Sequence, residues 1–321
     1  MDFDDLALAR HDNDRLAWNR KLSQVGPSTD IPVPTVIAYG MAEDNPTGLG
    51  PFLITTFVEG TPLGDMLKAD SVDEQGDKIL RSDIPDSTLR VVYQQIADVI
   101  LQLSEHDFDR IGSLSIDSDD NWSIESGPLT LNINELARCG DVYVEPRVYS
   151  TTADYLLEIA EQNILHLERQ RNSISSATDA RLKYTARHLF RAITPNFVSR
   201  RYNQGPFKLF CDDFRPGNIL VDNSFKITGI IDWEWCYAAP FQFTYAPPRW
   251  LLLKEPAYWD SNPDKEDLLN AYLPKLELFF RDLGGARAFS EGPGKPQHGS
   301  QSVEPDAPVH DRHDLLVQRG C

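Results

Sequence analysis

Apolar residues recur along this chain with two different spacings, one typical of helices and the other of strands. The clearest helical pattern lies in residues 86–103, where Asp86 is placed to cap the first turn. Its apolar side chains follow the helical period and are Leu89, Val92, Tyr93, Ile96, Val99, Ile100 and Leu103. Such a stripe marks a helix face that packs against the core rather than a ligand site.

The same reasoning predicts further helices at residues 63–68, 152–171, 178–193 and 264–281. Runs rich in β-branched and aromatic residues predict strands at residues 33–39 and 51–57, and a hairpin at residues 112–116 and 122–124. Short segments of turn-forming Asn, Asp, Gly and Pro separate these elements. The mixture indicates an α+β fold class.

The last part of the chain changes character. Residues 284–321 combine several glycines and prolines with many polar side chains, few apolar ones and no period. This composition predicts a disordered tail. The tail contains His298, His310 and His313, for which a solvated tail is a simpler explanation than a metal site.

Three side chains with oxygen atoms follow strands within residues 207–234. A short apolar strand ends at Cys211, and the polar loop after it contains Asp213 and Asn218, five positions apart. Two more strands joined by a turn follow, and Asp232 comes at the end of the second. Aspartate and asparagine are common in loops, so each residue alone would indicate structure. Their combination around one hairpin indicates a functional site.

Phosphoryl transfer from ATP needs this set of groups. One carboxylate accepts the proton of the attacking hydroxyl, while an amide and a second carboxylate hold Mg2+. The Asp-x-x-x-x-Asn spacing matches the catalytic loop of kinases. We therefore interpret Asp213 as the catalytic base, with Asn218 and Asp232 as metal ligands.

The segment resembles the aminoglycoside phosphotransferase (APH) family, whose loop reads His-Gly-Asp-x-x-x-x-Asn and is followed by Ile-Asp-Trp-Glu. The likeness covers about residues 30–282 and is greatest to APH-domain proteins of fungi, within the protein-kinase-like superfamily. It implies a two-lobe fold, ATP and Mg2+ as cofactors, and phosphorylation of a hydroxyl on a small-molecule substrate. It also implies that the nucleotide base docks at the hinge, which comprises Phe57, Val58, Glu59 and Gly60.

The catalytic loop departs from the family pattern at two positions. Cys211 replaces the histidine, which in the family braces the loop, and a thiol is a weak donor. Asp212 replaces the glycine and is expected to point into solvent. Arg215 is expected either to meet a phosphate or carboxylate or to form a structural salt bridge. Glu234 either orients the loop and substrate or is structural.

The N-terminal part departs further. A kinase N-lobe carries a loop over the phosphates and a Lys–Glu pair, but residues 1–30 contain one lysine, Lys21, and one glycine, Gly26, while the first glutamate is Glu43. We expect a truncated N-lobe and a mainly helical C-lobe. Along the chain these predict an atypical segment at 1–30, a partial N-lobe and hinge at 31–62, a C-lobe with the catalytic and metal loops at 63–283, and the tail at 284–321. Three readings stay open, namely an active kinase, an impaired relative that still binds a nucleotide or small molecule, and a truncated gene product.

The net charge and the cysteines indicate which classes of binding partner and which cellular compartment to expect. A formal net charge of −18 argues against binding to nucleic acid or to an anionic membrane surface. No apolar run approaches the roughly 18 residues of a membrane span, and the acidic N-terminus does not look like a signal peptide. The spacing of Cys139, Cys211, Cys236 and Cys321 does not suggest a zinc site. Free thiols favour a cytoplasmic location, and no pattern specifies an oligomeric state.

Overall fold

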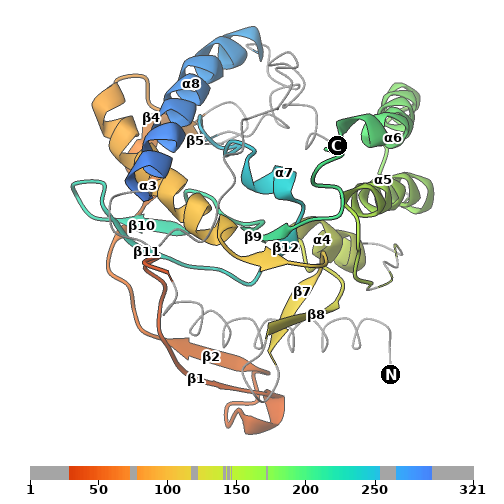
Figure 1. The fold of residues 1–321 in the computed structure, drawn as a ribbon, viewed down its shortest axis with the longest axis horizontal. Helices are drawn as coiled ribbons and strands as arrows, with labels where there is room; N and C mark the ends of the chain where they lie inside the picture. The colour runs from red at the N-terminus through yellow and green to blue at the C-terminus, as the bar shows by residue number, and fades with distance from the viewer. Residues whose placement is uncertain are drawn as a thin grey trace. The chain divides into compact units, whose positions relative to one another are not determined.

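The protein, described from a computed structural model, forms two compact units, each built from two stretches of chain. The structure describes residues 29–72, 78–116, 122–139, 142, 145, 147–170, 173–253 and 265–290. Unit 1 comprises the described residues of Met1–Leu63 and Gln102–Tyr245, and unit 2 those of Gly64–Leu101 and Ala246–Cys321. Helices and strands both occur (Figure 1), which confirms the predicted α+β class.

One sheet of unit 1 leads the chain toward the predicted catalytic loop. Its central strand β9 (Phe207–Cys211) pairs antiparallel with β12 (Cys236–Ala239) on one side and with β6 (Asp107–Phe108) on the other. Alternate residues of β9 are buried, as expected for a strand with one face on the core. That core consists of Ile111, Tyr149, Tyr155, Phe207, Tyr237 and Ala239.

A second sheet of unit 1 contains the hairpin that follows the predicted catalytic loop. Strands β10 (Ile219–Val221) and β11 (Ile227–Ile230) pair antiparallel, and β3 (Thr61–Pro62) lies on the other side of β10. The Asp222 carboxylate closes the turn by accepting hydrogen bonds from the backbone N–H groups of Ser224 and Lys226. Two further hairpins complete the strands of unit 1, β1 (Val36–Gly40) with β2 (Phe52–Thr55), and β7 (Ser113–Ile116) with β8 (Trp122–Ser126).

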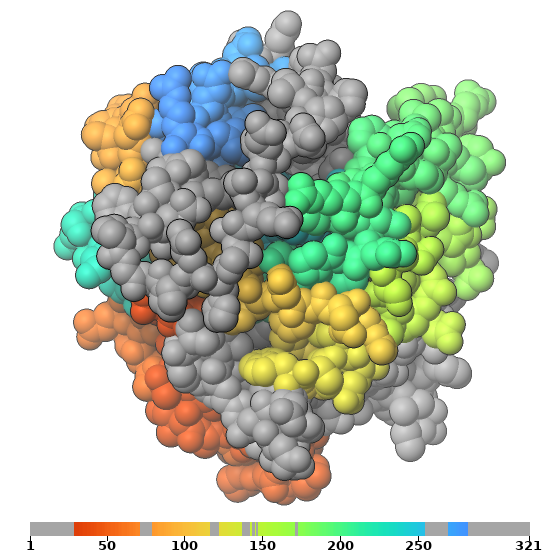
Figure 2. Space-filling view, in the orientation of Figure 1, coloured from red at the N-terminus to blue at the C-terminus, as the bar shows by residue number. Residues whose placement is uncertain are grey.

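The helices of unit 1 are α4 (Leu131–Cys139), α5 (Thr152–Arg169), α6 (Ala177–Phe197) and the short α7 (Phe241–Thr244). The side chains of Thr151 and Ser176 cap α5 and α6 by accepting hydrogen bonds from backbone N–H groups in the first turn. Helices α5 and α6 lie side by side, in yellow-green and green (Figure 2), and an ion pair between Arg191 and Glu161 joins them.

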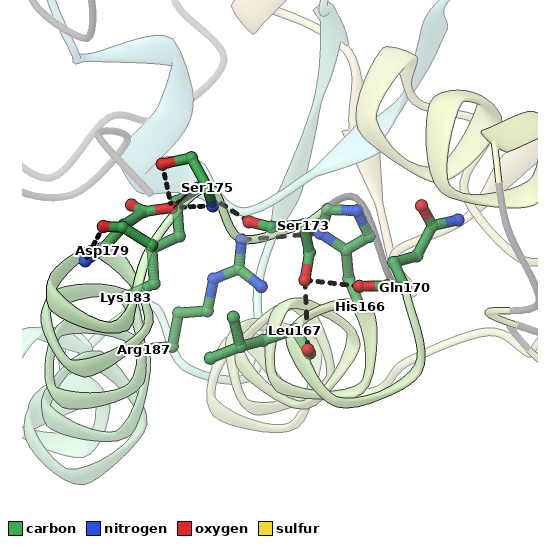
Figure 3. Close-up of polar contacts among 9 residues, drawn as sticks. His166, Leu167, Gln170, Ser173, Ser175, Asp179, Lys183 and Arg187 are labelled. Carbon is green, nitrogen blue, oxygen red and sulfur yellow. Dashed lines mark hydrogen bonds and ion pairs between the residues drawn. The ribbon is translucent and has the colours of Figure 1, made fainter.

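Basic side chains of α6 fasten the connection between these two helices (Figure 3). Lys183 Nζ donates to the carbonyl oxygen of Ser173. Arg187 donates to the carbonyl oxygen of Asn163, in α5. Arg187 also lies 3.5 Å from His166 Nδ1. Burial, followed by the charges of Arg187 and Lys183, lowers the pKa of His166. Lys183 and Arg187 are therefore engaged in contacts within the fold.

Unit 2 is built around α3 (Asp86–Ser104), whose last residues extend into unit 1, and α8 (Lys265–Ser290). The rings of Tyr93 and Phe279 meet edge to face, and Lys275 pairs with Asp86 at the start of α3. The helix α2 (Leu63–Leu67), which begins at the boundary, and the strand pair β4 (Lys68–Val72) with β5 (Lys78–Leu80) complete the unit. None of the helices within the described ranges is long and apolar enough to cross a membrane.

Most predicted elements are present with shifted ends. The predicted strand at 33–39 begins later, at Val36, and the last helix runs past residue 281 to Ser290. Residues 284–290 thus belong to α8 rather than to the predicted tail, and residues 291–321 lie outside the described part. The predicted N-terminal segment also lies outside it, up to residue 28.

Candidate active site

The three predicted site residues occupy loops that the backbone ties together. β9 ends at Cys211, so Asp213 lies at the start of the following loop, and Asn218 immediately precedes β10. The backbone N–H of Ile231 donates to the carbonyl oxygen of Asn218 at 2.9 Å. Because Asp232 follows Ile231 directly, this hydrogen bond holds the segment of Asp232 beside the catalytic loop.

Asp213 is almost fully buried and is held through both carboxylate oxygens. Its Oδ1 accepts a hydrogen bond from Arg215 Nε at 2.8 Å, and its Oδ2 accepts one from Asn218 Nδ2 at 2.8 Å. Asn218 Nδ2 also donates to the carbonyl oxygen of Asp213 at 3.0 Å. The carboxylate is thus fixed in orientation, as a positioned acid–base group requires. Of the two roles considered for Arg215, the structure shows a salt bridge within the chain, to the carboxylate of the predicted base.

The donor set fits Mg2+. Both N–H bonds of Asn218 are directed to Asp213, so the amide oxygen Oδ1 is the end left to bind something else. Among the described residues, no hydrogen bond or ion pair reaches the side chain of Asp232. Mg2+ takes oxygen ligands, commonly one or two carboxylates together with substrate phosphates.

The backbone of Asp232 is itself unusual. Its φ of 59° lies in the left-handed region, which is uncommon for residues other than glycine. Such conformations cost free energy and cluster at functional sites. The neighbouring packing holds this one, since the Trp233 indole N–H donates to the carbonyl oxygen of Ile230 and is buried.

The predicted nucleotide hinge lies beside the β10–β11 hairpin. Thr228 Oγ1, in β11, donates to the carbonyl oxygen of Glu59 at 2.7 Å. A Cβ added to Gly60 would lie 2.5 Å from the same Thr228 Oγ1, and one added to Gly229 would meet Val58. Phe57 is exposed to 90%. The hinge therefore contacts the hairpin whose two ends carry Asn218 and Asp232.

One residue of the catalytic loop differs from its prediction. Asp212 was expected to point into solvent, but its Oδ2 accepts a hydrogen bond from the backbone N–H of Leu131 at 3.1 Å. Leu131 is the first residue of α4, where unpaired N–H groups favour a negative charge. The backbone N–H of Asp212 also donates to the carbonyl oxygen of Trp235 at 3.0 Å. The solvent prediction was wrong because it considered only the local sequence.

Several of these contacts carry no local signal. Helix α4 was not predicted. The hydrogen bond from Leu131 to Asp212 and the one from Thr228 to Glu59 were not predicted either, because their partners are 81 and 169 residues apart in the sequence. These contacts and those around Asn218 hold the loop in place. Cys211 itself is buried.

Comparison with known proteins was consistent with the family resemblance over part of the chain. Residues 137–245 match the model of the phosphotransferase enzyme family, APH. This stretch includes Asp213, Asn218 and Asp232, and the hinge lies before it. The match supports the predicted resemblance to APH phosphotransferases, and the fungal subgroup stays a prediction.

The chain was also compared with curated proteins and with solved structures. No curated protein matches the chain. The fold aligns with the crystal structure of a thermostable mutant of the aminoglycoside phosphotransferase APH(4)-Ia, in a ternary complex with AMP-PNP and hygromycin B. The TM-score is 0.41 and the identity 16%, over 80% of this chain and 74% of that chain.

Proposed function

We propose that this protein catalyses ATP-dependent phosphoryl transfer to a hydroxyl of a small molecule, slowly, with Asp213 as the base. Asn218 and Asp232 would hold Mg2+, and the backbone of residues 57–60 would receive the nucleotide base. The observation that carries the proposal is the arrangement around Asn218. Its amide nitrogen orients Asp213, and its carbonyl oxygen anchors the segment of Asp232.

Each residue has a separate task in this proposal. Asp213, held by Arg215 and Asn218, accepts the proton of the attacking hydroxyl on a carboxylate oxygen. A base so positioned typically contributes about 10²–10⁴ in rate. Asn218 and Asp232 would hold Mg2+, which would supply positive charge to offset the charge on the phosphate oxygens. The hinge keeps the base of the nucleotide beside the hairpin that carries the proposed metal ligands; it comprises Phe57, Val58, Glu59 and Gly60.

We propose a low rate because the described residues of the N-terminal part lack the lysine that kinases place on an N-lobe strand. That lysine supplies part of the electrostatic stabilisation of the transferred phosphate. Residues 29–62, which include β1, β2 and the hinge, contain no lysine. The same observation favours a second candidate function, a protein that binds a nucleotide with Mg2+ but performs no transfer.

The test is an ATP titration by calorimetry with and without Mg2+, combined with a turnover assay over a panel of small hydroxyl compounds. We expect weak binding that requires Mg2+ and is lost in Asp232→Ala. We also expect slow turnover that is lost in Asp213→Asn. Asp109→Asn is the matched control, because the Asp109 side chain is 82% exposed and pairs with its sequence neighbour Arg110.

The outcomes separate the candidates. Binding that ignores both Mg2+ and Asp232→Ala would remove the metal assignment. Binding that follows the expectation, with no transfer to any compound, would favour the binding protein. Rapid turnover that disappears in Asp213→Asn would show a full kinase and contradict the expected low rate.

A further inference from the structure

Two buried thiols face each other at the base of the catalytic loop. Cys211 is the last residue of β9, Cys236 is the first residue of β12, and they are direct partners in the antiparallel register. Both are free cysteines, exposed to 5% and 0% respectively. Side chains of directly opposed residues lie on the same face of a sheet, so the two sulfur atoms share one environment.

The hydrogen-bond pattern shows which kind of pair this is. The neighbouring pair is joined, because Asp212 N–H donates to the Trp235 carbonyl oxygen at 3.0 Å. In an antiparallel ladder bonded and non-bonded pairs alternate, so Cys211 and Cys236 form a non-hydrogen-bonded pair. On the other side of β12, Ala238 exchanges both backbone hydrogen bonds with Gly112. Cys236, two residues earlier, therefore also directs its backbone groups away from β9.

This type of pair suits a disulfide. Opposed residues of a non-hydrogen-bonded pair have Cα atoms about 4.5 Å apart, and disulfides form at Cα separations of roughly 4.4–6.8 Å. The thiols already interact, since burial and then a hydrogen bond with Cys211 raise the pKa of the Cys236 thiol. A metal is a weaker explanation for the two thiols, because no group of three or more His, Cys, Asp or Glu side chains that could hold a metal ion occurs in the described ranges.

We propose that Cys211 and Cys236 are a reversible cross-strand disulfide site, which closes by exchange with a small-molecule disulfide. Cys211, the more exposed of the two, attacks one sulfur of the small disulfide and releases one small thiol. Cys236 then attacks the sulfur of Cys211 in this mixed disulfide and releases the second small thiol. Two protein thiols are oxidised to one disulfide, and one small disulfide is reduced to two thiols.

The disulfide would lie next to the proposed active site. It would join the strand that leads into Asp213 to the strand that follows Asp232, so oxidation would fasten together the two segments that enter and leave the proposed active site. The inference does not depend on the proposed function, because the thiol–disulfide equilibrium is measured without ATP or substrate.

The experiment is a redox titration in glutathione buffers with a variant carrying Cys139→Ser and Cys321→Ser, so that only the pair remains. Trypsin cleaves after Lys208, Lys226 and Arg249 and places the two cysteines in separate peptides, residues 209–226 and 227–249. We expect these peptides to be linked after oxidation and released by dithiothreitol. Cys211→Ala and Cys236→Ala, each in the same background, should give no linked peptide.

The decisive comparison is between the folded protein and the same chain unfolded in urea. If the fold holds the thiols together, the equilibrium constant for disulfide formation should be roughly tenfold or more higher in the folded protein. An equal or lower constant in the folded protein would overturn the proposal. Cross-links between two chains, or mixed glutathione disulfides that never close, would overturn it as well.

Discussion

At the scale of single residues, the hinge depends on a close approach that only glycine allows. Gly60 has a φ of 154°, and a Cβ there would lie 2.5 Å from Thr228 Oγ1 and 3.2 Å from the carbonyl oxygen of Val221. The first of these distances is too short for any real contact, so either the hinge or β11 would have to move. Gly60 thus keeps the proposed nucleotide segment against the β10–β11 hairpin.

We therefore predict that Gly60→Ala lowers the free energy of unfolding by about 1–3 kcal/mol, the usual cost of overpacking, and weakens ATP binding. Urea denaturation and an ATP titration measure the two effects. Gly48→Ala is the control, because Gly48 also has a positive φ, of 70°, but nothing lies within 4 Å of the added Cβ. It should show backbone strain alone, without loss of ATP binding.

The double variant Gly60→Ala with Thr228→Ala tests the mechanism. Removing Thr228 Oγ1 relieves the shortest contact. The losses of unfolding free energy from the two single substitutions should therefore not add in the double variant, as is usual for residues in direct contact. Additive losses would show that Gly60 acts through its backbone conformation and not through its approach to β11.

At the scale of elements, the loop that carries Asp213 is attached to a helix, α4, that was not predicted from the sequence. α4 begins at Leu131, and its first N–H is satisfied by Asp212, whereas Thr130 Oγ1 accepts from the N–H of Ile133. One acceptor is local and the other comes from the loop that carries Asp213. The position of the loop and the stability of the helix start are therefore linked.

We predict that Asp212→Ala lowers the free energy of unfolding by about 0.5–2 kcal/mol, the range for a lost helix-capping group. It should also reduce turnover in whatever assay detects transfer, because the loop loses one anchor. Asp212→Asn keeps an oxygen acceptor and removes the charge, so it should recover most of the stability. If both substitutions are neutral, the bond to Leu131 does not hold the loop.

The elements also show how far the sequence can be read. Helices α3, α5 and α6 were predicted because a long apolar period identifies them without knowledge of their partners. Strands β9, β10 and β11 were predicted because polar turns bound them. By contrast β3, β4, β5, β6, β12, α4 and α7 were missed, since they are short and carry no long apolar period. The contact of Asp212 was missed because its partner lies far away in the sequence.

At the scale of the whole molecule, the core of unit 2 contains tyrosines that resist ionisation. Burial raises the pKa of Tyr272 from 10.0 to about 12. Burial is also the first cause of the raised pKa of Tyr93, followed by the charges of Tyr272 and Asp86. Tyr93 donates a hydrogen bond to the carbonyl oxygen of Leu251, which ties α3 to the chain that precedes α8.

These raised pKa values predict a loss of stability in alkali. Each hydroxyl keeps its proton in the folded state to a higher pH than in the unfolded state, so its contribution is full below pH 10 and falls as the pH rises toward 12. For Tyr272 alone a shift of this size corresponds to at most about 3 kcal/mol. Urea denaturation at a series of pH values measures the slope.

Tyr272→Phe should flatten that slope, because it keeps the ring and removes the ionising hydroxyl. The comparison is the change in unfolding free energy between pH 9 and pH 12, so any constant loss from the missing hydroxyl cancels. Tyr39→Phe, on the exposed face of β1, is the control and should leave the slope as it is. Equal slopes for Tyr272→Phe and the unmodified protein would mean that Tyr272 ionises alike in the folded and unfolded states. The core of unit 2 would then have to be open to water around α8.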